Sequence, residues 1–185
     1  MATRSNILLK RKDGSFKSIY CHWDGYPQGV GQTLVEDYKD LDKVNKLLDL
    51  GDLSFIGREI GEKVDFNNHK IPTIKGEHAQ CLAYGRDRGD NGIGPRYWLS
   101  LERNFGVDYV YIFCEEEKRW TFFSTNRDQT QLDLKKWLYL DEMDFEEDKN
   151  LKGSEAQIFY QLVEYGDTWE ILKEKIHAVK RLSFI

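Results

Sequence analysis

Residues 7–23 read ILLKRKDGSFKSIYCHW, and this stretch predicts a β-hairpin. Two runs rich in apolar residues flank Asp13-Gly14, and an Asp-Gly pair favours the tight turn that joins two antiparallel strands. Alternate residues of a strand point to opposite faces, so one face of the second run carries Phe16, Ser18, Tyr20 and His22. The sequence therefore predicts an antiparallel strand pair near the start of the chain.

A second strand pair is predicted over residues 107–124, VDYVYIFCEEEKRWTFFS. The polar run Glu115–Lys118 interrupts two stretches of β-branched and aromatic residues, as a hairpin turn does. Both faces of the first stretch carry apolar side chains. We therefore expect this pair to be central in a sheet or covered by helices.

Helical spacing of apolar residues follows the first hairpin. Leu34, Tyr38 and Leu41 recur at the helical period, and Asp40 is a candidate N-cap for a helix that ends near Gly51. The segment 150–185 shows the same period and predicts a helical C-terminal part. Hairpins mixed irregularly with helices indicate an α+β fold, with an antiparallel or mixed sheet packed against helices. The length of 185 residues favours a single domain over 1–185.

Composition limits the classes of protein. The chain is 40% hydrophobic and 14% aromatic, which is enough apolar mass for a folded core. The apolar runs are short, so neither a membrane span nor a secretory leader is expected. Three cysteines without a CxxC motif favour a reducing compartment, and we expect Cys21, Cys81 and Cys114 to be buried, inert thiols. These features predict a protein of the cytoplasm.

The charge is unevenly distributed along the chain. The net charge of −5 argues against direct nucleic-acid binding by the chain as a whole. Residues 1–20 nevertheless carry five basic groups and one acid, whereas residues 141–148, DEMDFEED, carry six acids and no base. Such an acidic run could imitate a phosphate backbone and occupy a basic groove of a partner. It could equally be a solvated loop between helices.

The turn after the first hairpin, YCHWDGYPQGVGQTL at 20–34, has some features of a phosphate-binding loop. A P-loop needs a glycine five residues before Gly31 and a lysine directly after it, but Tyr26 and Gln32 occupy those positions. Gly29 and Gly31 could still direct backbone N–H groups at an anion. The alternative is a turn that Trp23 and Tyr26 anchor to the core.

No other motif of catalysis or metal binding is complete. His22 and Asp24 would share a face of a strand, but no HxxxH, HExxH or Cys/His cluster supplies further ligands. No GxSxG motif occurs either, so we predict no catalytic residues, metal or cofactor. The loop GRDRGDNGIGPR at 85–96 is a better candidate for binding. If it is strand-like, Arg86 and Arg88 form a fork for phosphate or carboxylate; the alternative is a solvated loop whose charges pair with one another.

Four motifs taken together resemble a family of small phage and prophage proteins. They are TRSNI (3–7), IYCHWDGYPQGVGQTLVEDY (19–38), VNKLLDLGDLS (44–54) and AYGRDRGD (83–90). The resemblance covers about residues 3–90 and implies a mobile-element origin and an accessory protein that acts in the host cytoplasm. It implies no catalytic residues. In its size and acidic charge the chain is also similar to anti-CRISPR proteins.

The leading hypothesis is therefore a non-enzymatic accessory protein of a phage or mobile element. It would bind and inhibit a host defence protein or ribonucleoprotein, such as a Cas9-type CRISPR effector. Its predicted contact residues are the acids Asp141, Glu142, Asp144, Glu146, Glu147 and Asp148, together with Arg86 and Arg88.

Two alternatives stay open. One is a nuclease, or another protein that binds or acts on RNA or small nucleotides, with a pocket formed by His22, Asp24, Gly29, Gly31, Arg86 and Arg88. The other is a structural adaptor or oligomerisation domain.

Overall fold

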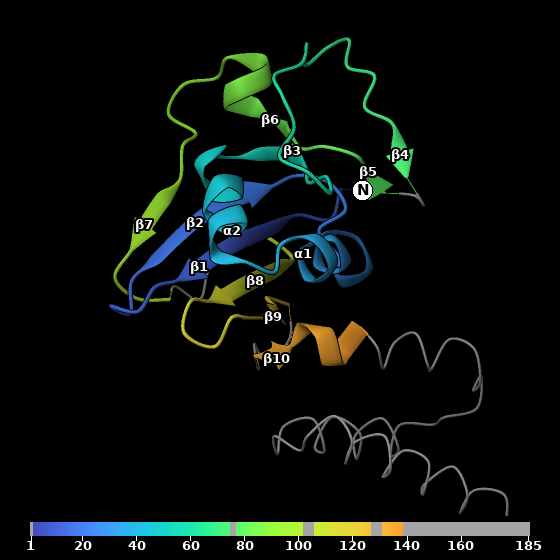
Figure 1. Ribbon diagram of the computed structural model, residues 1–185. Coiled ribbons are helices and arrows are strands. Elements are labelled where there is room, and N and C mark those ends of the chain that lie inside the picture. The colour runs from blue at the N-terminus through green and yellow to red at the C-terminus, as the bar shows by residue number, and fades with distance from the viewer. Residues whose placement is uncertain (1, 75–76, 102–105, 127–130, 139–185) are drawn as a thin grey trace, which may run out of the picture. The chain divides into compact units, whose positions relative to one another are not determined.

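The computed structural model describes residues 2–74, 77–101, 106–126 and 131–138 (Figure 1). The chain divides into two compact units, Met1–Lys135 and Lys136–Ile185, and the first contains all the named strands and helices. Both the acidic run 141–148 and the predicted helical segment 150–185 lie outside the described residues.

An eight-stranded mixed sheet organises this unit, in the order β10-β9-β8-β1-β2-β3-β6, with β7 also paired to β2. The strands are β1 (Ser5–Lys10), β2 (Phe16–Cys21), β3 (Leu53–Phe55), β6 (Leu82–Ala83), β7 (Arg96–Trp98), β8 (Tyr109–Cys114), β9 (Arg119–Ser124) and β10 (Leu132–Asp133). A separate pair is formed by β4 (Thr73–Ile74) and β5 (Glu77–His78). The helical elements are η1 (Pro27–Gly31), α1 (Gln32–Asp37), α2 (Leu41–Asp49) and η2 (Tyr84–Arg88), and residues 134–138 are also helical. The predicted α+β class is confirmed.

Both predicted hairpins are present. In the first, the backbone reverses at Gly14 with φ 84°, and the Asp13 carboxylate accepts a hydrogen bond from Ser15 N at 2.9 Å. In the second, β8 and β9 pair antiparallel on either side of the predicted turn. The two hairpins join through β1 and β8, which run parallel and place Ile7 opposite Tyr111. β1 therefore lies at the centre of the sheet, and its residues Ile7 and Leu8 are fully buried.

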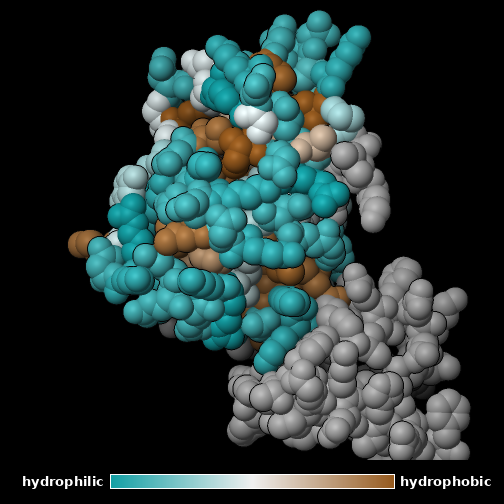
Figure 2. Space-filling model, viewed as in Figure 1, coloured by the Kyte–Doolittle hydropathy of each residue, from teal (hydrophilic) through white to brown (hydrophobic). Residues whose placement is uncertain are grey.

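Helices α1 and α2 cover one face of the sheet (Figure 1). The side chain of Asp40 accepts a hydrogen bond from Lys43 N at 2.8 Å, so the predicted cap of α2 is confirmed. Val44, Leu47 and Leu48 form the buried side of this helix. Figure 2 shows that the outer face of the molecule on this side is mostly hydrophilic, as expected for helices that turn one stripe to a core.

Two buried hydrogen bonds fix the aromatic residues of the sheet to the helical layer. The Tyr111 hydroxyl donates to Gly25 O at 2.8 Å, and Trp120 Nε1 donates to Tyr38 O at 2.8 Å. A hydroxyl or an indole N–H inside a core needs such a partner, because an unpaired buried donor loses its hydrogen bond to water. Each bond therefore ties one strand of the second hairpin to the segment between β2 and α2.

The opposite face of the sheet carries a second apolar cluster. Its buried members are Leu8, Phe16, Val107, Val110, Ile112 and Phe123, with Tyr20 and Trp98 partly buried against them. The three cysteines are free thiols and are buried, as predicted. No helix among the described residues is long and apolar enough to cross a membrane.

We predict that Tyr111→Phe lowers the free energy of unfolding by about 1–2 kcal/mol, because it leaves the buried Gly25 carbonyl without its donor. Urea denaturation measures the change. Tyr97→Phe is the matched control, since that residue is 59% exposed. Equal stability of the two variants would show that the Tyr111–Gly25 bond contributes nothing.

Candidate functional site

The turn that follows β2 is held by its own backbone. β2 ends at Cys21, after which His22 N donates to Leu53 O at 3.0 Å. Asp24 adopts a left-handed conformation with φ 56°, and its carbonyl accepts from Val30 N at 2.8 Å. The prediction that His22 and Asp24 share a strand face is therefore wrong, because the strand stops before either residue.

Gly25 shows why the turn needs a glycine. A Cβ at this position would lie 2.7 Å from Arg4 C, so the turn crosses directly over the start of β1. Gly25 N also donates to Thr3 O at 2.9 Å. The turn is thus fixed to the centre of the sheet by close backbone contact rather than by its aromatic side chains.

Trp23 and Tyr26 point outward. Trp23 is 47% exposed and Tyr26 is 40% exposed, which corrects the expectation that they anchor the turn to the core. Pro27 and Val30 are the buried residues that supply this anchor. Two large aromatic side chains are therefore presented to solvent on a rigid backbone.

The glycines of the turn do not form an anion site. Gly29 N donates to Tyr26 O at 3.0 Å, so it is already bonded. Gly31 lies in a buried helical turn, where a Cβ would approach the Tyr111 ring at 3.2 Å. Neither residue presents an open cradle of the kind that a phosphate needs.

Arg86 and Arg88 lie on the helical turn η2 rather than on a strand, which corrects the predicted fork. Arg86 turns inward. Its guanidinium donates to the carbonyl oxygens of Ile60, Gly61 and Cys81 at 2.7–3.0 Å and to the carboxylate of Asp87. These bonds leave Arg86 no capacity for a ligand, so its role is to join η2 to the segments around it.

The Asp87 carboxylate completes this connection. Its side chain is fully buried and accepts hydrogen bonds from Ala83 N at 2.7 Å and Val64 N at 3.1 Å as well as from Arg86. Burial alone raises the pKa of a carboxyl group, but the hydrogen bonds from Arg86, Ala83 and Val64 outweigh it and lower the pKa of Asp87. The group is therefore ionised and fully paired at neutral pH.

Arg88 turns outward and lies on two aromatic rings. Its guanidinium carbon is 4.3 Å from the centroid of Tyr84 and 4.9 Å from that of Phe66. Asp90 holds one edge of the guanidinium through two bonds of 2.8 and 2.5 Å. The side chain is 43% exposed, so a planar cation rests on a ring pair with part of its surface open to a partner.

A second group of rings lies beside the first. Tyr20 and His22 are joined by a hydrogen bond of 2.7 Å between the hydroxyl and Nδ1, and the rings of His22 and Trp23 pack edge to face at 4.8 Å. Ser54 connects the two groups, since its carbonyl accepts from Trp23 N at 2.9 Å and its side chain bonds Tyr84. Together they form a ring surface, whose members are Tyr20, His22, Trp23, Phe66, Tyr84 and Arg88.

Two more histidines pack at the border of the ring surface. His78 stacks on Phe55 with a centroid distance of 3.7 Å, and His69 lies 5.8 Å from the same ring. Burial lowers the pKa of His78, and its Nδ1 is buried without a hydrogen-bond partner. Through these contacts the segment that contains His69 and His78 packs against Phe55 of β3.

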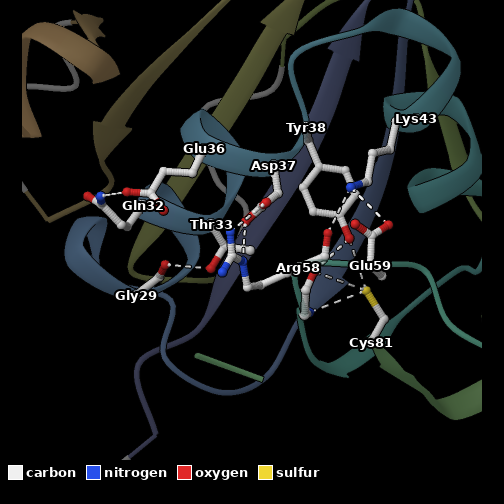
Figure 3. Close-up of polar contacts among 11 residues, drawn as sticks. Gly29, Gln32, Thr33, Glu36, Asp37, Tyr38, Lys43, Arg58, Glu59 and Cys81 are labelled. Atoms are coloured by element: carbon white, nitrogen blue, oxygen red, sulfur yellow. Dashed lines mark hydrogen bonds and ion pairs between the residues drawn. The ribbon is translucent and has the colours of Figure 1, made fainter. Parts of the chain in front are cut away.

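A polar network joins the helical layer to the segments that follow β3 and precede β6 (Figure 3). The Tyr38 hydroxyl donates to Gly57 O at 2.7 Å and lies 3.3 Å from the Cys81 Sγ. Lys43 Nζ sits 4.9 Å from the Tyr38 ring centroid and donates to Arg58 O. Burial raises the pKa of both Tyr38 and Cys81, so both groups are neutral and act as structural hydrogen-bonding partners.

The structure brings together only part of the pocket proposed from the sequence. His22 and Arg88 belong to the ring surface, and Asp24 lies near His78. Arg86, Gly29 and Gly31 take structural roles instead. Within the described part of the chain, no three His, Cys, Asp or Glu side chains are placed to hold a metal ion.

Sequence reasoning missed Tyr20, Phe66 and Tyr84 as surface groups. Tyr20 and Tyr84 sit in strand-like runs whose aromatic residues are usually core, and Phe66 lies in a mixed segment without periodicity.

Comparison of the chain with models of protein families, with curated proteins and with solved structures finds no match.

We predict that Asp87→Asn lowers the free energy of unfolding by about 3 kcal/mol at neutral pH, because it removes one partner of a buried ion pair. The lowered pKa means that the ionised carboxylate stabilises the fold above the unfolded pKa of about 4, and that this stability is lost as the pH falls through the folded value. Urea titrations from neutral to acid pH should therefore converge for the two proteins.

The control is Asp90→Asn, which removes the carboxylate of the exposed pair with Arg88. Solvent screens that pair, so the change in stability should be much smaller. A loss of stability as large as that of Asp87→Asn would contradict the structural role assigned to Asp87.

Proposed function

We propose that this protein is a non-catalytic accessory protein of a phage or mobile element that binds and inhibits a host defence nucleoprotein, in the manner of an anti-CRISPR protein. The observation that carries the proposal is the outward placement of Trp23, Tyr26 and Arg88 on a rigid turn and helical loop. Tryptophan, tyrosine and arginine are the residue types that dominate the binding energy of protein interfaces. The motifs of the first 90 residues support the mobile-element origin.

Preorganisation of these side chains supports a binding role. Backbone hydrogen bonds fix the turn that carries Trp23 and Tyr26, and Asp90 together with two rings fixes Arg88. Side chains that are already ordered lose less entropy on association. The exposed aromatic residues therefore add affinity without a large cost of ordering.

The acidic run 141–148 supplies the charge in this proposal. Its six carboxylates would occupy a basic groove that normally holds nucleic acid, and its contacts would depend strongly on salt. Arg86 is no longer among the proposed contacts, because its donors are used within the fold. Arg88 keeps that role.

The binding proposal is favoured over the RNA- or nucleotide-cleaving alternative by the position of Arg86 and the glycines. A phosphoryl-transfer site needs convergent cations and open N–H donors. In the described residues Arg86, Gly29 and Gly31 are bonded or packed within the fold, which removes half of the pocket on which that alternative rested.

We predict that the double variant Trp23→Ala/Tyr26→Ala weakens capture of a Cas9-type effector by about tenfold or more, because each residue type is a typical interface hot spot. Pulldown and isothermal titration with the effector, with and without guide RNA, measure the change. Tyr97→Ala is the matched control, an exposed aromatic residue on β7 beside the other end of β2. An absence of association by the unmodified protein, with no inhibition of cleavage, would refute the proposal.

We also predict that replacing Asp144, Glu146, Glu147 and Asp148 with Ser or Asn weakens effector binding and flattens its dependence on salt. Titrations at several salt concentrations separate the two effects. If affinity and salt dependence both stay unchanged, phosphate mimicry by this run is excluded, and the binding energy comes from other residues.

A further inference from the structure

The ring surface consists of planar groups rather than aliphatic ones. Five of its members are aromatic or imidazole rings, and the sixth is a guanidinium stacked on two of those rings. The exposed aliphatic residues Leu99 and Leu101 instead lie after the end of β7, which pairs with Phe16–Ser18 of β2. Arg88 covers the rings of Tyr84 and Phe66, so Trp23 and the Arg88 guanidinium are the planar groups that are exposed for stacking.

Two polar atoms on this surface have no hydrogen-bond partner among the described residues. Arg88 bonds Asp90 through Nε and Nη2, which leaves Nη1 without an acceptor. His22 uses Nδ1 toward Tyr20, which leaves Nε2 without a partner. These atoms can bond the edge of a planar ligand while the rings contact its face.

A second cation lies near Tyr20 of the ring surface. Arg4 is exposed, and its guanidinium lies near the Tyr20 hydroxyl; burial raises the pKa of this hydroxyl and Arg4 partly offsets that rise. Arg4 therefore lies near Tyr20, whereas Arg88 lies on Tyr84 and Phe66. Asp90 pairs with Arg88, and Asp52 pairs with Arg96.

We infer that the ring surface binds the unpaired bases of single-stranded RNA by stacking, and that, within the proposed function, its target is the exposed guide of the nucleoprotein. Aromatic side chains and arginine planes stack with any base, because every base has a π-face. The rings of Tyr20, the turn after β2 and η2, together with their polar atoms, supply both parts of this recognition. Duplex RNA hides its bases and cannot use it.

The charges of this region distinguish such stacking from ordinary electrostatic binding. The net charge is −5 and Arg88 is paired, so few phosphates can be neutralised. Each neutralised phosphate contributes about −0.7 to the slope of log K against log salt for a single strand, so Arg4 and Arg88 together give a slope no steeper than about −1.5. A shallow slope with dependence on bases is the signature of this surface.

Fluorescence anisotropy tests the inference with labelled single-stranded RNA of about twelve nucleotides and an abasic strand of the same length and charge. We expect the full-length protein to bind the strand with bases about tenfold or more tightly than the abasic strand and the duplex. Equal affinity for the abasic strand, or no binding of either strand, overturns the inference.

Two variants locate the binding. Trp23→Ala and Arg88→Lys should each weaken RNA binding by about fivefold or more, since lysine keeps the charge of Arg88 but loses its plane. Tyr97→Ala should leave it unchanged, and thermal unfolding checks that all three variants are folded. If Arg88→Lys binds as the unmodified protein does, charge rather than stacking carries the contact and the inference fails.

The experiment separates this inference from the function on which it rests. Capture of an effector that requires Trp23, together with no binding of free RNA, shows that the surface contacts protein, which overturns the inference and keeps the proposed function. Binding of base-containing RNA with no capture of any effector supports the surface as an RNA site and refutes the proposed function.

Discussion

The parallel pairing of β1 with β8 is the contact on which the rest of the structure depends. It joins two hairpins that are about a hundred residues apart in sequence, and each hairpin alone would be marginal in water. Its register places Tyr111 opposite Ile7, from where the Tyr111 hydroxyl reaches Gly25. The turn after β2 is thereby fixed over the start of β1, and the orientation of Trp23 and Tyr26 follows from that position.

Two buried carboxylates also connect segments that are distant in sequence. Asp52 accepts from Tyr20 N at 2.8 Å and pairs with Arg96 at 2.6 and 3.0 Å, so one side chain connects β2 with β7. Asp87 and Arg86 join η2 to the segments on both sides of it. Ion pairs of this kind are geometrically demanding, because each charge must be fully bonded once it is removed from water. Arg86, one of the two arginines predicted from the sequence to contact a partner, is for this reason part of the scaffold, whereas Arg88 is exposed.

Local signals in the sequence predicted local structure well. The Asp13-Gly14 turn, the polar turn of the second hairpin and the Asp40 cap each depend on residues within a few positions, and all three are present. The parallel pairing has no such signal, because nothing in β1 encodes its distant partner. The helical turn η2 was missed since Gly, Asp and Arg are typical of loops, and the bonds that hold it include those of Asp87 with Ala83 N and with Val64 N, a residue distant in sequence. Trp23 and Tyr26 were assigned to the core on hydrophobicity alone, which does not account for a turn that is already satisfied by its backbone.

The charge of the protein limits how the candidate site can bind a partner. A protein with net charge −5 repels nucleic acid at long range, and this repulsion suppresses non-specific binding to the large excess of cellular RNA and DNA. Specific contact must then come from short-range forces, namely stacking on rings and hydrogen bonds to edges, which act only when a partner presents the right surface. Pairing Arg88 with Asp90 has the same effect, because it keeps the planar guanidinium in place while cancelling its charge at a distance. Such a surface adds little to the association rate constant. It can still discriminate between partners, because a complex with the right partner dissociates more slowly.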